Sequence, residues 1–155
     1  MTTLTHSIFL RCAILLLMIS AASACTAKTS SEDLIVIQGA WVRPTNPGQA
    51  VGAAYMTLTS KEDVSLVSVE ADVSKNVEIH SMSMENGVMK MRMLKTLPLK
   101  ADVPYKLAPG GFHLMLFDLK KPLAVDEQVD FVLTFKKNNN VTFKQTIKAS
   151  VQNPA

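Results

Sequence analysis

The amino-acid sequence predicts an all-β domain, built as an antiparallel sandwich or barrel. Its 155 residues, of which 48% are hydrophobic, suffice for one domain with a buried core. Short β-type runs, divided by turn residues, recur at a spacing of roughly 8–12 residues, which is typical of such folds. No segment shows a sustained helical period of apolar residues. Length, spacing and the missing helical pattern together indicate the fold class.

Eight runs carry the expected strands. In chain order they cover residues 34–37, 54–59, 64–69, 77–84, 88–93, 113–119, 129–135 and 141–147. No internal repeat divides this stretch, so we place a single β domain at residues 34–150.

The N-terminus has the pattern of a secretory signal, which we assign to residues 1–24. Arg11 precedes an apolar run over residues 12–19, and small residues fill positions 20–24. The run is shorter than the roughly 20 residues that a membrane-spanning helix needs. Residues 25–33 are rich in Ser and Thr, so we expect a flexible tether there. The sequence therefore predicts an exported protein of the periplasm or cell envelope.

Cys25 directly follows the small residues, where a bacterial lipoprotein carries its acylated cysteine. Ala22 stands where such a motif usually has Leu, so simple cleavage after Ala24 remains open beside lipid anchoring. Cys12 would be removed with the signal, which leaves one cysteine in the mature chain. The β domain thus has neither a disulfide nor a cysteine ligand, and we expect membrane contact only through a lipid on Cys25.

Charge and motifs argue against two classes of function. The formal net charge of +3 comes from 16 basic and 13 acidic residues that are scattered along the chain, and aromatic residues make up 6%. This pattern does not indicate nucleic-acid binding. The domain has no Gly-x-Ser-x-Gly motif, no cysteine nucleophile and no His beside a carboxylate in a recognisable constellation. We therefore do not expect an enzyme.

Asn86-Gly87 is the preferred pair for a two-residue type I′ turn, because both positions need positive φ. Such a turn predicts three opposed pairs, which are Met84 with Met89, Met82 with Met91 and His80 with Met93. Since side chains alternate along a strand, these six residues share one face of the hairpin, and the polar residues Ser81, Ser83, Lys90 and Arg92 occupy the other.

A second turn signal, Pro109-Gly110-Gly111, comes directly before a strand in which residue types alternate. The alternation assigns Phe112, Leu114 and Leu116 to the core. His113 and Met115 are then expected on the opposite face, toward a rim.

Histidine and methionine are concentrated in these two segments. After residue 24 the chain has two histidines, each with a Met two residues later, and six of its seven methionines lie between Met82 and Met115. Neutral thioether sulfur is a soft ligand that favours Cu(I), and imidazole is compatible with it. Methionine also fills ordinary cores. However, it is uncommon in strands compared with Val and Ile, so the cluster predicts a copper site.

The spacing of four of these residues, His80, Met91, His113 and Met115, resembles the motif of the periplasmic copper chaperones called PCu(A)C. The resemblance extends over residues 35–147 and includes Trp41-Val42-Arg43-Pro44, Gly52-Ala53-Ala54-Tyr55-Met56, Gly87-Val88-Met89-Lys90-Met91-Arg92 and Pro109-Gly110-Gly111-Phe112-His113-Leu114-Met115-Leu116. It implies a cupredoxin-like Greek-key β-barrel, with these four residues as ligands of one Cu(I) per chain. Met82, Met89 and Met93 would form a collar or a docking surface, and Met84 at the turn is assigned neither role.

The same resemblance implies a monomeric metallochaperone that delivers copper toward the binuclear site of cytochrome c oxidase subunit II, alongside Sco-type proteins. A copper store or resistance protein could use the same four ligands and remains the alternative. A blue-copper electron carrier needs a cysteine thiolate that this domain lacks. The chain ends in Ser150-Val151-Gln152-Asn153-Pro154-Ala155, without the Met- and His-rich tail of some relatives, so we expect one site.

Overall fold

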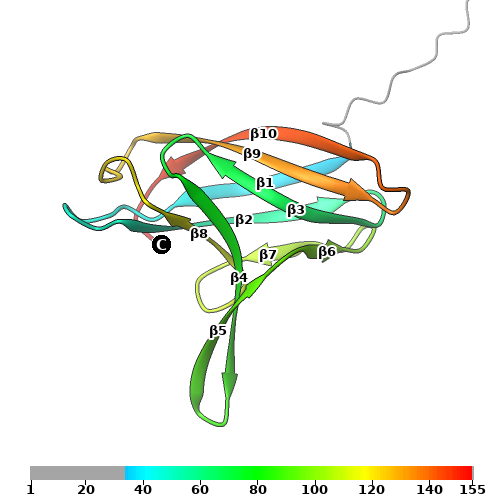
Figure 1. Cartoon of the computed structure of the whole chain (residues 1–155), viewed down its shortest axis with the longest axis horizontal. Helices are drawn as coiled ribbons and strands as arrows, with labels where there is room; N and C mark the ends of the chain where they lie inside the picture. The colour runs from blue at the N-terminus through cyan, green and yellow to red at the C-terminus, as the bar shows by residue number, and fades with distance from the viewer. Residues whose placement is uncertain (1–33, 155) are drawn as a thin grey trace, which may run out of the picture.

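The computed structural model describes residues 34–154, which form ten β-strands and, over that range, no helix (Figure 1). In chain order the strands are Ile35–Val42 (β1), Val51–Ser60 (β2), Val64–Ala71 (β3), Asn76–Glu85 (β4), Val88–Leu94 (β5), Leu97–Leu99 (β6), Tyr105–Leu107 (β7), His113–Phe117 (β8), Gln128–Lys137 (β9) and Thr142–Val151 (β10). The predicted all-β class is confirmed. No helix in this part of the chain is long and apolar enough to cross a membrane.

The strands join into one sheet in the order β5-β4-β8-β2-β1-β10-β9-β3-β6, with β7 added beside β2. Neighbouring strands are antiparallel with one exception, because β1 pairs with β10 in parallel through Trp41 opposite Ser150 and Val42 opposite Val151. This departs from the purely antiparallel arrangement that the sequence suggests. Through that pair the first and last strands lie side by side in the centre of the sheet order.

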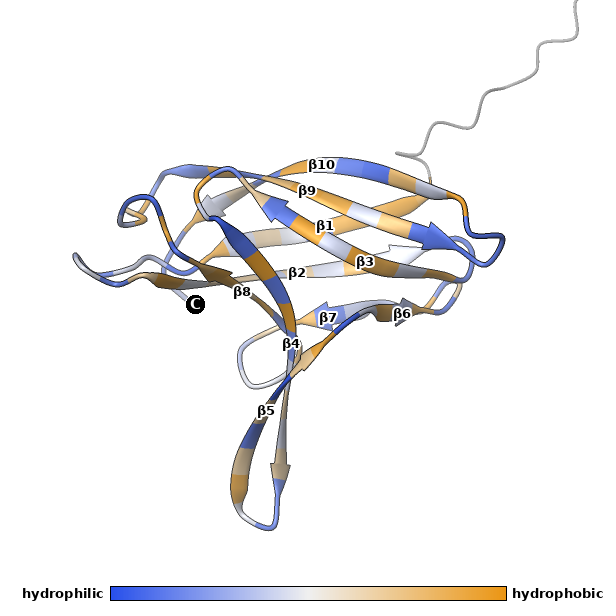
Figure 2. Cartoon of the chain, in the orientation of Figure 1, coloured by the Kyte–Doolittle hydropathy of each residue, from blue (hydrophilic) through white to orange (hydrophobic). Residues whose placement is uncertain are grey.

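Strand β9 shows how alternation builds the core. Val129, Phe131, Leu133 and Phe135 are each 0% exposed, and the residues between them face outward or are half-buried. Burying each such side chain contributes about 1.5–3 kcal/mol. Figure 2 shows the same alternation of hydrophobic and hydrophilic residues along the strands of the body. The body is therefore held together by side chains that a period of two directs inward.

All eight expected strands are present, although several extend beyond the predicted bounds. The strands that sequence analysis missed are β6 and β7, each of three residues, too short for alternation to be legible. The last strand continues to Val151, one residue past the predicted domain end. The expected signal at 1–24 and the whole of the expected tether at 25–33 lie outside the described residues.

The hairpin formed by β4 and β5 projects away from the body (Figure 1). The first half of β4, from Asn76 to His80, pairs with β8, whereas the stretch from Ile79 to Glu85 pairs with β5. Strand β5 ends the sheet order, and every residue of it except Leu94 is exposed. One strand thus connects the packed body to a two-stranded ribbon in solvent.

Candidate metal centre

The β4–β5 hairpin has the predicted register. Asn86 and Gly87 form the turn with φ of 52° and 77°, as a type I′ turn requires. The opposed pairs are His80 with Met93, Met82 with Met91 and Met84 with Met89. Since directly opposed residues share a face, one side of the ribbon carries imidazole and five thioethers.

The Pro109-Gly110-Gly111 segment lies between β7 and β8 in the chain and hydrogen-bonds to this hairpin. Gly110 has a φ of +83° and the Gly111 N–H donates to the Ala108 carbonyl at 3.0 Å, which is the geometry of a type II turn. The Gly111 carbonyl then accepts from the Met82 N–H at 3.2 Å and lies 3.0 Å from His113 Nδ1. One carbonyl thereby fixes both the hairpin and the second histidine.

His80 and His113 are directly opposed on β4 and β8, with ring centroids 5.8 Å apart. The His80 ring also lies beside Phe117, at 6.2 Å between centroids. His113 is 4% exposed and the His80 side chain 12% exposed. The predicted alternation in β8 is confirmed by the buried Leu114 and Leu116, but His113 is buried itself and does not stand at an open rim.

The two predicted methionine ligands lie on either side of this imidazole pair. Met115 is opposed to Glu78, one register row toward the body, and is half-buried. Met91 is opposed to Met82, one row toward the hairpin tip, and is 48% exposed. Along this face the thioether of Met115 comes first, then the two imidazoles, then the thioether of Met91. Met93 is directly opposed to His80, which makes it a closer neighbour of that ring by register than Met91.

A carboxylate that was not predicted from the sequence lies beside His80. Glu78 Oε2 lies 2.8 Å from His80 Nε2, and the Asn76 amide donates to Glu78 Oε1 at 3.0 Å. Asn76, Glu78 and His80 alternate along β4 and so share a face, which is the signal that could have revealed the contact. The sequence-based expectation concerned only a recognisable catalytic constellation, and it did not include this His-carboxylate contact. Within residues 34–154 the hydrogen-bond partners of the two imidazoles are this carboxylate and the Gly111 carbonyl.

The hydrogen-bond partners decide which nitrogen of each neutral imidazole can bind a metal. A carboxylate and a carbonyl only accept, so His80 carries its proton on Nε2 and His113 on Nδ1. The free nitrogens are His80 Nδ1 and His113 Nε2. His80 Nδ1 is buried and has no hydrogen-bond partner, an arrangement that is costly unless a ligand completes it.

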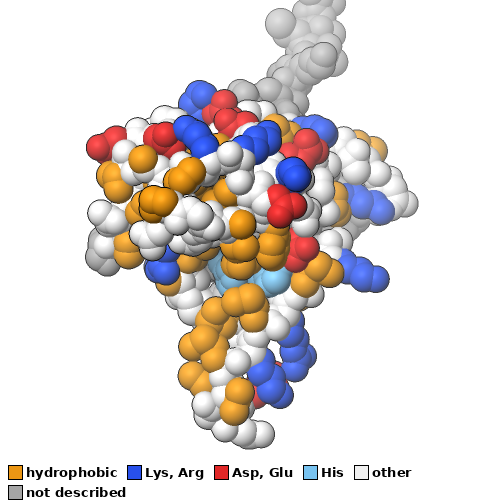
Figure 3. Space-filling model, turned by 60° about the vertical axis from the view of Figure 1, so that its left-hand side comes forward, with side chains coloured by type: hydrophobic (Ala, Val, Ile, Leu, Met, Phe, Trp, Pro, Cys, Tyr) orange, Lys and Arg blue, Asp and Glu red, His pale blue; other side chains and the backbone are white. Residues whose placement is uncertain are grey.

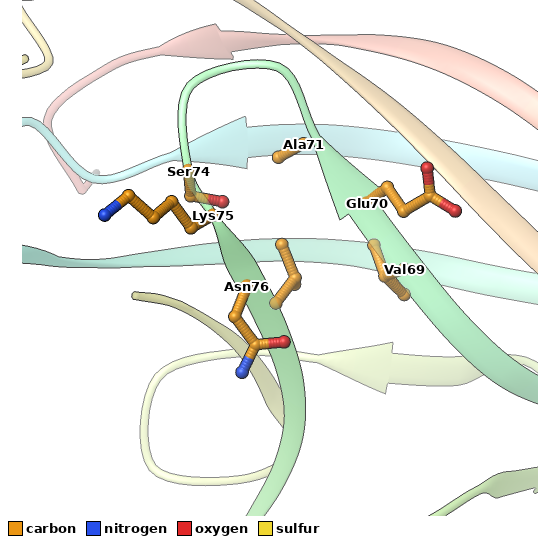
Figure 4. Close-up of a pocket in the computed structure, with 7 residues that line it drawn as sticks. Val69, Glu70, Ala71, Ser74, Lys75 and Asn76 are labelled. Atoms are coloured by element: carbon orange, nitrogen blue, oxygen red, sulfur yellow. The ribbon is translucent and has the colours of Figure 1, made fainter. Parts of the chain in front are cut away.

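Other parts of the described chain offer no competing metal centre. Over residues 34–154, no group of three or more His, Cys, Asp or Glu side chains is placed to hold an ion. A pocket of about 230 Å³ opens where β3 ends and β4 begins, and Figure 4 shows Glu70, Ser74, Lys75 and Asn76 around it. Its lining has no imidazole or sulfur and therefore does not suit a soft metal.

The opposite face of the hairpin is held by ion pairs. Glu85 accepts from Lys90 at 2.8 Å and from Arg92 at 3.0 Å. The hydrogen bond from Lys90, together with the charge of Arg92, lowers the pKa of the Glu85 carboxyl below its ordinary value. Polar contacts thus occupy one face of the ribbon and leave the methionine face free.

Comparison with known proteins places the chain among relatives of the expected kind. A family model described as "Putative lipoprotein LpqE-like" matches residues 35–147. An uncharacterized protein of Rickettsia prowazekii (strain Madrid E) is 29% identical over 153 residues, covering 86% of this chain and 80% of that protein. A protein of Leifsonia xyli subsp. xyli (strain CTCB07), named "Putative lipoprotein", is 26% identical over 104 residues, covering 66% of this chain and 63% of its own length.

Two solved structures share the fold. The copper-bound PCuAC domain from PmoF2 has a TM-score of 0.62 and 24% identity, covering 77% of this chain and 93% of the domain. The Cu(I) form of DR1885 from Deinococcus radiodurans has a TM-score of 0.51 and 30% identity, covering 83% of this chain and 85% of that one. These matches confirm the predicted cupredoxin-like fold and the resemblance to PCu(A)C proteins, which are also written PCuAC.

Glu78→Gln should disturb the imidazole of His80 without affecting that of His113. A glutamine amide can donate as well as accept, so it no longer requires the proton on His80 Nε2. Long-range ¹H–¹⁵N NMR of the apo protein reads the tautomers directly. Loss of a group that orients a metal ligand lowers affinity by about 10–100-fold, so we expect weaker Cu(I) binding as well.

The matched control is Glu70→Gln, which removes a carboxylate that faces Lys144 at 3.6 Å. It should leave both tautomers and the Cu(I) affinity unchanged. A wild-type spectrum with the His80 proton on Nδ1 would contradict the assignment.

Proposed function

Because this chain belongs to the LpqE-like family and has the fold of PCuAC domains, we propose that it binds one Cu(I) ion and hands it to another protein outside the cytoplasm. The proposed ligands are His80, Met91, His113 and Met115. The observation that carries the proposal is the buried, unpartnered Nδ1 of His80, in a ring 5.8 Å from that of His113 on a face with thioethers. DR1885, which is 30% identical, has a Cu(I) form, and this supports the choice of metal.

The donor set suits a monovalent soft ion. Two neutral imidazoles and two thioethers add no charge to the ion, and thioether sulfur offers little to Zn, Mg or Ca. Glu78 places one carboxylate near the proposed site, because its Oε2 lies 2.8 Å from His80 Nε2. That carboxylate offsets the charge of Cu(I) without binding it, while its hydrogen bond holds the ring in place.

The unequal exposure of the ligands supports release by ligand exchange. His113 is buried and fixed by the Gly111 carbonyl, whereas Met91 lies on the ribbon and is 48% exposed. An acceptor can approach the ion from the Met91 side and replace this sulfur first. The remaining ligands then hold the ion until the acceptor has supplied new ones.

We propose the binuclear copper site of cytochrome c oxidase subunit II, or a Sco-type protein, as the acceptor, and the cell envelope as the location. Support comes from the PCu(A)C resemblance, from the lipoprotein name of the family, and from Cys25 after a signal-like segment. A copper store would use the same ligands, so transfer must be measured to separate the two functions. No feature of the described residues indicates an enzyme.

Met91→Leu should weaken Cu(I) binding while leaving the apo protein nearly as stable as before. The substitution keeps volume and removes the sulfur, and the side chain is 48% exposed, so the free energy of unfolding should change by less than about 0.5 kcal/mol. Cu(I) affinity should fall by at least about tenfold, the lower end of the loss seen when metal sites lose a supporting group. Chelator competition measures the affinity, and thermal unfolding measures the stability.

Met56→Leu is the matched control, because Met56 is 2% exposed in the core and far from the hairpin register. It should alter stability by less than about 1.5 kcal/mol and leave copper binding unchanged. X-ray absorption of the loaded wild-type protein should show mixed nitrogen and sulfur scattering. Absence of sulfur scattering would exclude the proposed ligands.

Transfer distinguishes a chaperone from a store. We expect the Cu(I)-loaded protein to resist a moderate Cu(I) chelator and yet to load the soluble copper domain of subunit II, because a docked acceptor can exchange ligands one at a time. Absorbance of the chelator and copper analysis of the separated proteins follow the two processes. Copper that reaches the acceptor no faster than it reaches the chelator would indicate a store.

Lipid anchoring is tested by Cys25→Ser. The wild-type protein should fractionate with membranes and, by intact-mass measurement, begin at an acylated Cys25, whereas the variant should be released into the soluble envelope fraction. A mature wild-type chain without added acyl mass would show that export occurs without the anchor.

A further inference from the structure

The hairpin continues beyond the row of His80 and carries four closely set methionines, of which the proposed copper site uses one, Met91. Past the row of His80, the ribbon carries two opposed methionine pairs, Met82 with Met91 and Met84 with Met89. All four lie on the face that contains His80, and the ion pairs of Glu85 lie on the other face. Met91 belongs both to this group and to the proposed ligands.

Three of these four methionines are exposed in a way that packing does not explain, and the fourth, Met82, is half-buried. Met84 is 65%, Met89 60% and Met91 48% exposed, and every strongly exposed methionine in residues 34–154 lies on this hairpin. Figure 3 shows hydrophobic side chains along one side of the projecting ribbon, with the histidines at its base and Lys and Arg on the other side. Contiguous exposed apolar surface of this kind usually has a function.

The register allows the four sulfurs to converge. Directly opposed residues on an antiparallel ribbon have Cβ atoms about 4.5–5.5 Å apart, and diagonal neighbours are about 7–8 Å apart. Methionine has a long unbranched side chain with a terminal thioether, so the sulfurs of two adjacent pairs can reach a common point above the face. Solvent exposure leaves that point open to an incoming ion.

We propose that Met82, Met84, Met89 and Met91 form an outer, all-thioether site that captures Cu(I), or the similar soft ion Ag(I), and passes it to the imidazole pair. The transfer step rests on the proposed function, whereas the outer site does not. Thioethers are soft and neutral, which selects a monovalent soft ion over Zn, Mg or Ca. The outer site is weaker than the inner one because it has no nitrogen donor.

The movement between the sites is ligand exchange with no change of oxidation state. Met91 stays bound while the bonds to Met82, Met84 and Met89 break, and bonds to His80 Nδ1, His113 Nε2 and Met115 form. Both nitrogens have free lone pairs in the tautomers that Glu78 and Gly111 impose, so no proton has to leave. Since Met91 is shared, one chain holds one tightly bound ion, in agreement with a single delivery site.

The first test removes the inner site. The full chain with ¹³C-methyl-labelled methionine and the changes His80→Ala and His113→Ala is titrated with Ag(I). We expect the methyl signals of Met82, Met84, Met89 and Met91 to shift, while that of the buried Met56 stays in its native position and reports that the domain is folded. Unchanged hairpin methyl signals in this folded variant would overturn the proposal.

The second test addresses the route. Met84→Leu with Met89→Leu keeps the apolar surface and removes two sulfurs, so Cu(I) capture from a chelator complex should slow several-fold while the equilibrium affinity of the inner site is unchanged. Val88→Leu is the control, since it alters an exposed residue of the same hairpin without touching a sulfur. Equal capture rates in wild type and the double leucine variant would contradict the relay.

The two proposals fail in different ways. If wild-type protein binds Ag(I) on the hairpin but neither imidazole responds, the proposed inner ligands are wrong and the outer site stands. If the imidazoles respond and the hairpin methyl groups do not, the inner site stands and the relay is wrong.

Discussion

The direct opposition of His80 and His113 across β4 and β8 is the constraint on which the rest of the site depends. A shift of one residue in this register would turn one of the imidazoles toward the core and replace it with Ile79 or Leu114. Those two residues are 4% and 0% exposed, so the core itself resists the shift. The packing of apolar side chains on one face of β4 and β8 thereby holds the imidazoles together on the other.

Strand β4 combines two environments that have different physical requirements. Its first half belongs to the packed body, where the Glu78 contact and the Gly111 carbonyl orient the two imidazoles. Its second half lies in solvent, paired only with β5, where packing contributes little. Imidazoles held by hydrogen bonds therefore adjoin accessible thioethers, a combination that suits the proposed binding and release of an ion.

The exposed methionine face favours association with other chains, and the polar face of the ribbon opposes it. Exposed apolar side chains on an edge strand invite association with other chains. The ribbon is twisted by its type I′ turn, and Glu85, Lys90 and Arg92 place charges along the face opposite the methionines. Valine would supply apolar surface with better strand propensity, so the presence of thioether sulfur here agrees with the proposed role in metal chemistry.

Local patterns in the sequence predict eight of the ten strands, the Asn86-Gly87 turn and the pairing of Met91 with Met82, because alternation and turn chemistry act over a few neighbouring residues. The spacing of histidine and methionine in the sequence also indicates the resemblance to PCu(A)C proteins. Tertiary packing is needed to place His80 opposite His113, to bury His113, to make β1 and β10 parallel and to hold the Glu78 carboxylate against the His80 ring. These features depend on which distant strands become neighbours, and that choice is made by the shared core, which no local pattern encodes.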